Sequence, residues 1–204
     1  MEDSLAHCDR LLDYLKASNL VTSYLLMTGR YLEAFHQHAG ASRLALSCGL
    51  HQIRSPVYST NHVTADGPGP QLIPPPTNQL ELGDRILIFW SIYSRDKASS
   101  IITGFASAID DVHDDIITPL PRPPSEYETN DVRAVDVERL SDIFDSPAAR
   151  VTERRPDTVF SSQIKGVTLI GRARAASPSP RTSSSVLPDL YRKLTVRIQI
   201  NGSE

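Results

Sequence analysis

The sequence predicts an all-α protein, an irregular multi-helix domain with long proline-rich loops and a disordered C-terminal tail. Apolar residues recur at spacings of three and four along several segments, which is the pattern of a helix with one buried face. The 15 prolines are clustered, and such clusters separate helices because proline lacks the backbone donor. The 204 residues, 40% of them apolar, are enough for one domain with a modest core.

Two helices are expected before residue 30. Apolar spacing predicts the first over residues 4–17 and the second over residues 20–27. Ser18 and Asn19 are interpreted as the junction, because asparagine favours the N-cap position. Gly29 then ends the second helix.

A third helix is expected over residues 31–48. Its alanines are small, so that a neighbouring helix can approach closely on that side. Gly49 fits the left-handed position after a helix end, and Leu50 fits the apolar contact back to the last turn.

Residues 55–77 are too rich in proline and glycine for a helix or a central strand. We expect an exposed loop with polyproline character at Pro74-Pro75-Pro76. Two interpretations stay open, namely a tolerated surface insertion and a docking site for a proline-reading partner.

The central helix of the domain is expected over residues 78–104. Asn78 and Glu81 have the spacing of a capping box. The following residues are apolar nearly all round, including Phe89, Trp90 and Tyr93, and this indicates burial on most sides.

The rest of the chain gives weaker patterns. Short helices are predicted over residues 132–144 and 158–174, and residues 191–200 alternate like a lone strand. Residues 175–185 are rich in serine, proline and arginine, which favours disorder. Residues 105–145 carry 3 basic and 11 acidic side chains, whereas residues 146–204 carry 10 and 4. This asymmetry is typical of flexible, interacting segments, although two solvated stretches can differ this way by chance.

Composition excludes several functional classes. A net charge of −3 excludes a globally basic nucleic-acid binder. Cys8 and Cys48 are too few for a disulfide framework or a zinc site built from thiolates. The N-terminus does not resemble a signal peptide, and the apolar run of residues 86–90 is far too short for a membrane span. We therefore expect a soluble, non-secreted chain.

The one candidate metal site is an acidic stretch, Asp110, Asp111, His113, Asp114 and Asp115. Carboxylates and an imidazole suit a hard cation, but the spacing is not that of a calcium loop, and a solvated acidic turn is the favoured interpretation. A small helical metalloenzyme is therefore a rival hypothesis. The sequence lacks a nucleophile elbow and a phosphate-binding glycine loop, so we predict no catalytic residue.

Three blocks of sequence carry a resemblance to a known family. They are residues 39–51, residues 85–97 and residues 104–121. In this order and spacing they resemble the fungal-specific transcription factor domain, the middle regulatory region of zinc binuclear cluster activators of the xylanolytic type. The residues that carry the resemblance are Gly49, Leu50, His51, Arg85, Phe89, Trp90, Tyr93, Asp96, Gly104, Ile109, Asp110, Asp111, Ile116 and Pro121.

The resemblance implies a core over residues 1–121, a continuation with weaker helices over 122–174 and a tail over 175–204. In the family the third block packs over the first two. Two departures stand out: Phe105 and Ala106 follow Gly104 where the family usually has Arg-Pro, and Arg85 stands where the family often has a run of arginines.

The function implied is regulation of RNA polymerase II transcription in the nucleus, without enzymatic activity and without a cofactor in this chain. An inducer or a protein partner is expected to bind between the helices 31–48 and 78–104, near Tyr93, Asp96 and His51. Asp96 is expected at the edge of the apolar core, with a surface ion pair as the other interpretation.

DNA and zinc binding are expected only through an N-terminal cluster of six cysteines that this sequence lacks. The chain is then either a fragment or truncated gene model, or a natural regulator without a DNA reader. The alternative function is an interaction module that competes with, or pairs with, a full-length relative. Homodimer formation stays open, and no membrane partner is expected.

Overall fold

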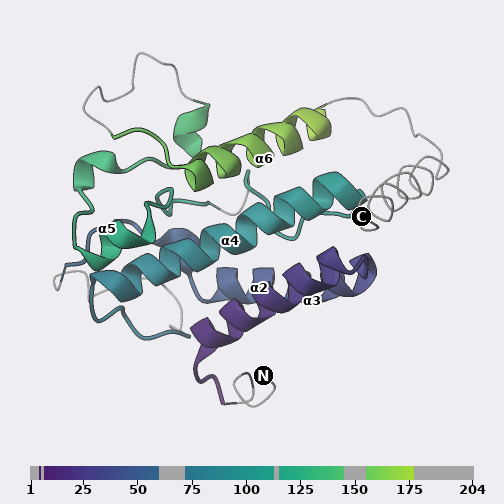
Figure 1. Cartoon of the computed structure of the whole chain (residues 1–204), viewed down its shortest axis with the longest axis horizontal. Helices are drawn as coiled ribbons and strands as arrows, with labels where there is room; N and C mark the ends of the chain where they lie inside the picture. The colour runs from purple at the N-terminus through teal and green to yellow at the C-terminus, as the bar shows by residue number, and fades with distance from the viewer. Residues whose placement is uncertain (1–4, 6, 60–71, 113–114, 145–154, 177–204) are drawn as a thin grey trace, which may run out of the picture. The chain divides into compact units, whose positions relative to one another are not determined.

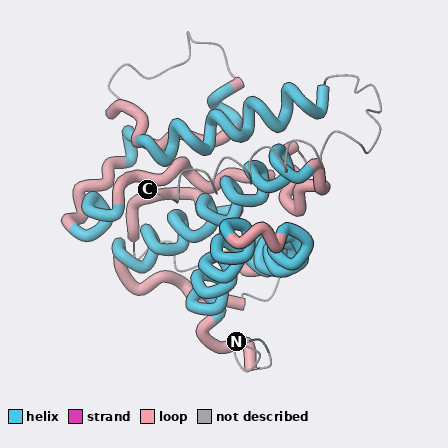
Figure 2. Tube along the Cα trace, turned by 45° about the vertical axis from the view of Figure 1, so that its right-hand side comes forward, coloured by secondary structure: helices cyan, strands magenta, loops and turns pink. Residues whose placement is uncertain are grey.

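The fold is helical, as the sequence predicts. A computed structural model describes residues 5, 7–59, 72–112, 115–144 and 155–176, and within these ranges helices are joined by loops without any strand (Figure 2). The helices are α2 (Leu11–Met27), α3 (Tyr31–Ser47), α4 (Gln79–Thr103), α5 (Pro124–Glu128) and α6 (Val159–Ala176), with short 3-10 turns η1 (Leu50–Gln52), η3 (Ala134–Asp136) and η4 (Ser141–Ile143). The chain divides into a unit of Met1–Gly171 and a second of Arg172–Glu204, and α2 to α5 lie wholly in the first.

The predicted pair of helices before residue 30 is a single helix. α2 runs through Ser18 and Asn19 without a break. Ser18 is fully buried and its carbonyl accepts a bond from the hydroxyl of Thr22, while Asn19 accepts a bond from Arg95 of α4. The asparagine therefore makes a tertiary contact rather than a cap. The predicted junction between two helices at Ser18 and Asn19 is wrong.

The third helix ends as the sequence predicts. Gly49 follows α3 with φ +72°, a left-handed conformation that glycine adopts without steric cost. Leu50 then turns back into the core and is 2% exposed. The backbone turn at residues 49–52 is thereby fixed beside α4.

α4 is the central helix, as expected. Asn78 caps it by accepting the backbone N–H of Glu81. Figure 1 shows α4 running between α3 on one side and α6 on the other. The rings of Phe89, Trp90 and Tyr93 are fully buried and pack edge to face or tilted, with centroids 5.1 to 6.4 Å apart.

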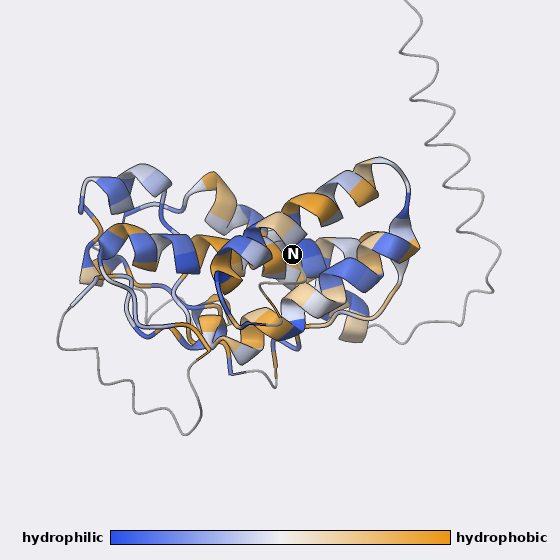
Figure 3. Cartoon of the chain, turned by 90° about the horizontal axis from the view of Figure 1, so that it is seen from below, coloured by the Kyte–Doolittle hydropathy of each residue, from blue (hydrophilic) through white to orange (hydrophobic). Residues whose placement is uncertain are grey.

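Loops complete the cover of α4. The described residues of 107–121, here called the covering segment, contribute Ile109, Ile116 and Leu120 to the same core. Figure 3 shows hydrophobic and hydrophilic stretches on the same helices, as expected of helices that bury one face.

The helix predicted over residues 132–144 is wrong, and α5 was missed. The region forms only η3 and η4, because its apolar residues do not share one face: Val135 and Phe144 are exposed, while Val132 and Leu140 are buried. Ion pairs hold it instead.

The ion pairs of this region converge on one arginine. The Arg155 guanidinium lies 2.6 Å from Asp136, 2.9 Å from Asp131 and 3.2 Å from Glu126. Burial opposes the charge of Asp136, but hydrogen bonds from Arg133 and Arg155 hold the pKa of Asp136 well below its ordinary value.

The predicted helix over residues 158–174 is confirmed as α6, which extends to Ala176. Its last residues were expected to be disordered, so the helix continues slightly further than the sequence indicates. Most of the proline-rich loop (residues 60–71), the expected strand at 191–200 and the tail beyond Ala176 lie outside the described residues.

α4 and α5 approach so closely that a glycine is required between them. A Cβ at Gly83 would lie 2.3 Å from the Tyr127 ring, whereas a Cβ at Gly40, exposed on α3, would meet nothing within 4 Å. We predict that Gly83→Ala destabilises the protein by about 1–3 kcal/mol through overpacking. Gly40→Ala should instead stabilise it by up to about 1 kcal/mol. Urea unfolding of both variants measures the difference, and equal effects would contradict this packing.

Candidate functional site

The first contact between α4 and the covering segment is made by Asp96. Its side chain is 4% exposed. Its carboxylate accepts the backbone N–H groups of Ala108 and Ile109, each at 3.0 Å, and the hydroxyl of Ser107. The surface ion pair considered for Asp96 is therefore wrong, because the residue binds backbone inside the protein.

Lys97, the next residue of α4, makes the second contact. Its ammonium donates to the carbonyl of Ile109 at 2.6 Å and lies 2.7 Å from the Asp111 carboxylate. Both members of this ion pair are about nine-tenths buried. Adjacent residues of α4 thus satisfy both the donors and the acceptors of the segment, and such charge-assisted bonds are the strong ones.

The other end of the covering segment is fixed by Trp90 and by the turn after α3. The Trp90 indole donates to the carbonyl of Pro119 at 2.7 Å. Thr118 donates its hydroxyl to the carbonyl of Leu50, and the N–H groups of Ile117 and Thr118 donate to the carbonyl of His51. The covering segment therefore joins the turn to the central helix.

The structure brings together residues from all three sequence blocks that carry the family resemblance. His51 and Leu50 bind through their backbone carbonyls, whereas Trp90 and Asp96 bind through their side chains. Arg85 lies apart from these contacts, where it bonds the carbonyl of Pro74 and the carboxylate of Glu81.

The acidic stretch does not form a metal centre in the part that is described. Asp111 pairs with Lys97, and Asp110 accepts the backbone N–H of Val112. His113 and Asp114 lie outside the described residues. Within the described ranges no three His, Cys, Asp or Glu side chains converge as ligands.

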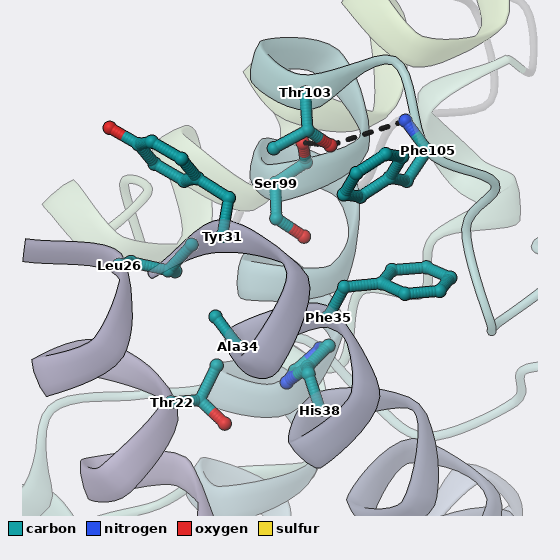
Figure 4. A pocket seen from close by; sticks show the side chains of 9 residues that line it. All are labelled: Thr22, Leu26, Tyr31, Ala34, Phe35, His38, Ser99, Thr103 and Phe105. Carbon is teal, nitrogen blue, oxygen red and sulfur yellow. Dashed lines mark hydrogen bonds between the residues drawn. The ribbon is translucent and has the colours of Figure 1, made fainter. Parts of the chain in front are cut away.

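A small hollow lies between α2, α3 and the C-terminal half of α4 (Figure 4). It is lined by Thr22, Leu26, Tyr31, Ala34, Phe35, His38, Ser99, Thr103 and Phe105. Its volume is about 10 Å³, which is room for roughly one water molecule. Phe105, one of the departures from the family pattern, closes it by packing on Phe35 with ring centroids 4.9 Å apart.

A wider groove adjoins the hollow and has a volume of about 500 Å³. Its lining is Leu26, Tyr31, Ser91, Ser94, Arg95, Ala98, Ser99, Ile102, Thr103, Phe160 and Gln163. The predicted helix pair, α3 and α4, contributes to both spaces. Tyr93 and His51 line neither, because Tyr93 is buried and bonded to Thr168, while His51 lies in the turn at residues 50–52.

Two polar residues here were given no functional role from the sequence, namely Arg95 and His38. Arg95 is half-buried, and burial lowers the pKa of its guanidinium. His38 is 3% exposed, with its Nε2 atom 3.7 Å from the carboxylate of Asp96. Burial lowers the pKa of His38, and Arg95 adds to this effect while Asp96 opposes it. Ser91, Arg95 and Ser99 are spaced four residues apart, so they form a polar strip along one face of α4. This spacing is the one signal in the sequence that indicates this face.

Comparison with known families gives one match. The model of the fungal specific transcription factor domain matches residues 3–159. The chain belongs to this family.

The match implies what the domain does in general terms. Fungal specific transcription factor domains form regulatory regions of transcription factors, act in the nucleus and are not enzymes. Comparisons with curated proteins and with solved structures found no match. Among the described helices of the domain, none is both long and apolar enough to span a lipid bilayer.

The Asp96 contacts predict a large effect of a minimal change. Asp96→Asn keeps the shape but replaces an acceptor of two backbone N–H groups with an amide, so the transcription factor domain should lose about 2–4 kcal/mol of stability. Asp13→Asn is the matched control, because Asp13 pairs with Arg10 on the surface, and such pairs contribute less than about 1 kcal/mol. Chemical denaturation compares the two variants, and equal losses would contradict the role of Asp96.

The buried imidazole predicts a pH dependence of stability. The native state favours neutral His38, whereas the unfolded chain takes up a proton below pH 6.5. Stability is therefore complete above that value and falls with pH below it, by at most about 1.4 kcal/mol per unit. His38→Gln should flatten the dependence between pH 7 and 5, while His36→Gln, at an exposed position of α3, should not. Urea unfolding at both pH values decides this, and an unchanged slope in His38→Gln would contradict it.

Proposed function

We propose that this domain regulates RNA polymerase II transcription in the nucleus by changing state when an inducer or a protein partner binds. The observation that carries the proposal is the groove over α4, because its walls come from α2, α3 and α6 while its floor is α4 itself. A ligand there contacts several elements at once. A ligand shifts an equilibrium only through different contacts in the two states, and a site shared by several helices permits such a difference.

The covering segment is the proposed link between the groove and the rest of the core. Asp96 and Lys97 hold it, and Arg95 beside them faces the groove. Movement of this part of α4 therefore changes the groove and the contacts of the covering segment at the same time. The role proposed for the residues of the three blocks is thus to couple the segment to α4, within a regulatory core of residues 1–121 and its continuation over 122–174.

The alternative, a competitor or partner of a full-length relative, is favoured by a different observation. Leu20, Tyr24 and Met27 form an apolar stripe along α2 that is 61% to 88% exposed. Their spacing places them on one face of the helix, which suits a contact with another protein chain.

A transcription reporter separates the two functions. The chain is fused to an unrelated DNA-binding module in fungal cells, and reporter transcript is measured across a panel of carbon and nitrogen sources. We expect the fusion to change transcript by about threefold or more in at least one condition, relative to the module alone. Asp96→Asn should remove the response, whereas Asp13→Asn should keep it, because the surface pair contributes little to the fold.

A fusion that behaves like the module alone in every condition would contradict the regulatory proposal. The unfused chain, expressed beside an intact zinc-cluster activator, tests the alternative in the same assay. Lower activator output, restored when Tyr24 and Met27 are changed to lysine, would support competition through α2.

A further inference from the structure

The floor of the groove differs from the rest of α4. The middle of the helix is buried and largely apolar, but Ser91, Ser94, Arg95, Ala98 and Ser99 present small or polar side chains to the groove. The strip leaves a space of about 500 Å³, within the usual range for sites of drug-sized ligands.

Among the described residues that line this space Arg95 is the only cation, and no described carboxylate neutralises its charge. Its Nε atom donates to the amide oxygen of Asn19 at 2.7 Å, and no carboxylate within the described ranges forms an ion pair with it. A half-buried charge without a counter-ion costs free energy. Arg95 therefore keeps most of its planar donor fork for an anion that comes from outside.

The surroundings of Arg95 specify the rest of the ligand. The hydroxyls of Ser91 and Ser94 form no hydrogen bond with the rest of the described chain, so both remain available beside the guanidinium. Leu26, Ile102 and Phe160 supply apolar walls. The site thus combines a bidentate anion donor, two hydroxyls and an apolar surface.

We propose that the groove binds a small amphipathic carboxylic acid, with its carboxylate on Arg95 and its apolar body between Leu26, Ile102 and Phe160. The planar guanidinium matches a carboxylate with two parallel bonds. This inference deepens the proposed function, because it names the chemical class of the inducer at the same groove.

Binding to the purified full-length chain tests this without any transcription readout. The probes are octanoate and 3-phenylpropanoate, with octanamide and 3-phenylpropanamide as neutral isosteres, measured by calorimetry and ligand-observed NMR. Each acid should bind at least about tenfold more tightly than its amide, which is the typical effect of charge-assisted bonds.

Variants place the site. Arg95→Gln should weaken acid binding by at least about tenfold and leave amide binding unchanged, whereas Arg10→Gln, an exposed arginine paired with Asp13 on α2, should change neither. Ala98→Trp should fill the groove and abolish binding of both, with the thermal midpoint confirming that each variant is folded.

Equal affinities for acid and amide, no binding of either acid to the folded chain, or full binding by folded Arg95→Gln would each overturn the proposal. Acid binding together with an unresponsive reporter would leave this site standing and remove the inducer response. A responsive reporter without acid binding would support the proposed function and overturn the carboxylic acid site.

Discussion

Burial of the middle of α4 is the constraint on which the structure depends. Phe89, Trp90 and Tyr93, near the centre of this 25-residue helix, are fully buried, and the other four described helices do not provide all of their cover. The remaining surface is covered by the covering segment, which has no regular hydrogen bonds of its own. Each backbone group buried without a partner costs about 1–3 kcal/mol, so the segment can be buried only where other groups satisfy it.

The side chains that solve this problem are the ones the family resemblance rests on. Asp96 accepts two N–H groups, Trp90 donates to a carbonyl, and the turn of Leu50 and His51 offers two carbonyls. These residues are separated in the sequence but meet along one path over α4. Their residue types follow from the chemistry of the segment: an anion opposite donors, and donors opposite carbonyls.

The C-terminal half of the same helix carries the proposed ligand site. Beyond Tyr93 the helix carries Arg95 beside the two residues that hold the covering segment, and its polar strip faces an open groove. Packing and the proposed ligand binding are thus adjacent on one helix. Any movement of α4 at the groove therefore occurs directly next to the contacts that Asp96 and Lys97 make with the covering segment.

The sequence predicts the elements whose signals are local. Glycine after α3, the capping residue Asn78 and the apolar run of α4 needed no knowledge of distant contacts. The predicted cap at Asn19 is wrong because the partner of this residue, Arg95, is 76 residues away in the sequence. A rule based on neighbouring residues alone does not include such a contact. Residues 132–144 misled because ion pairs to Arg155 replace helical periodicity. Arg95 and His38 belong to different helices, and only the packing of α2, α3 and α4 places them beside the groove and the hollow.

Hydrogen exchange of the covering segment tests the central claim most directly. The amides of Ala108, Ile109, Ile117 and Thr118 have acceptors in Asp96 and in the carbonyl of His51. The account predicts that they exchange only with global unfolding, at rates close to those of the buried amides of α4. Exchange as fast as in an exposed loop, while α4 remains protected, would contradict it.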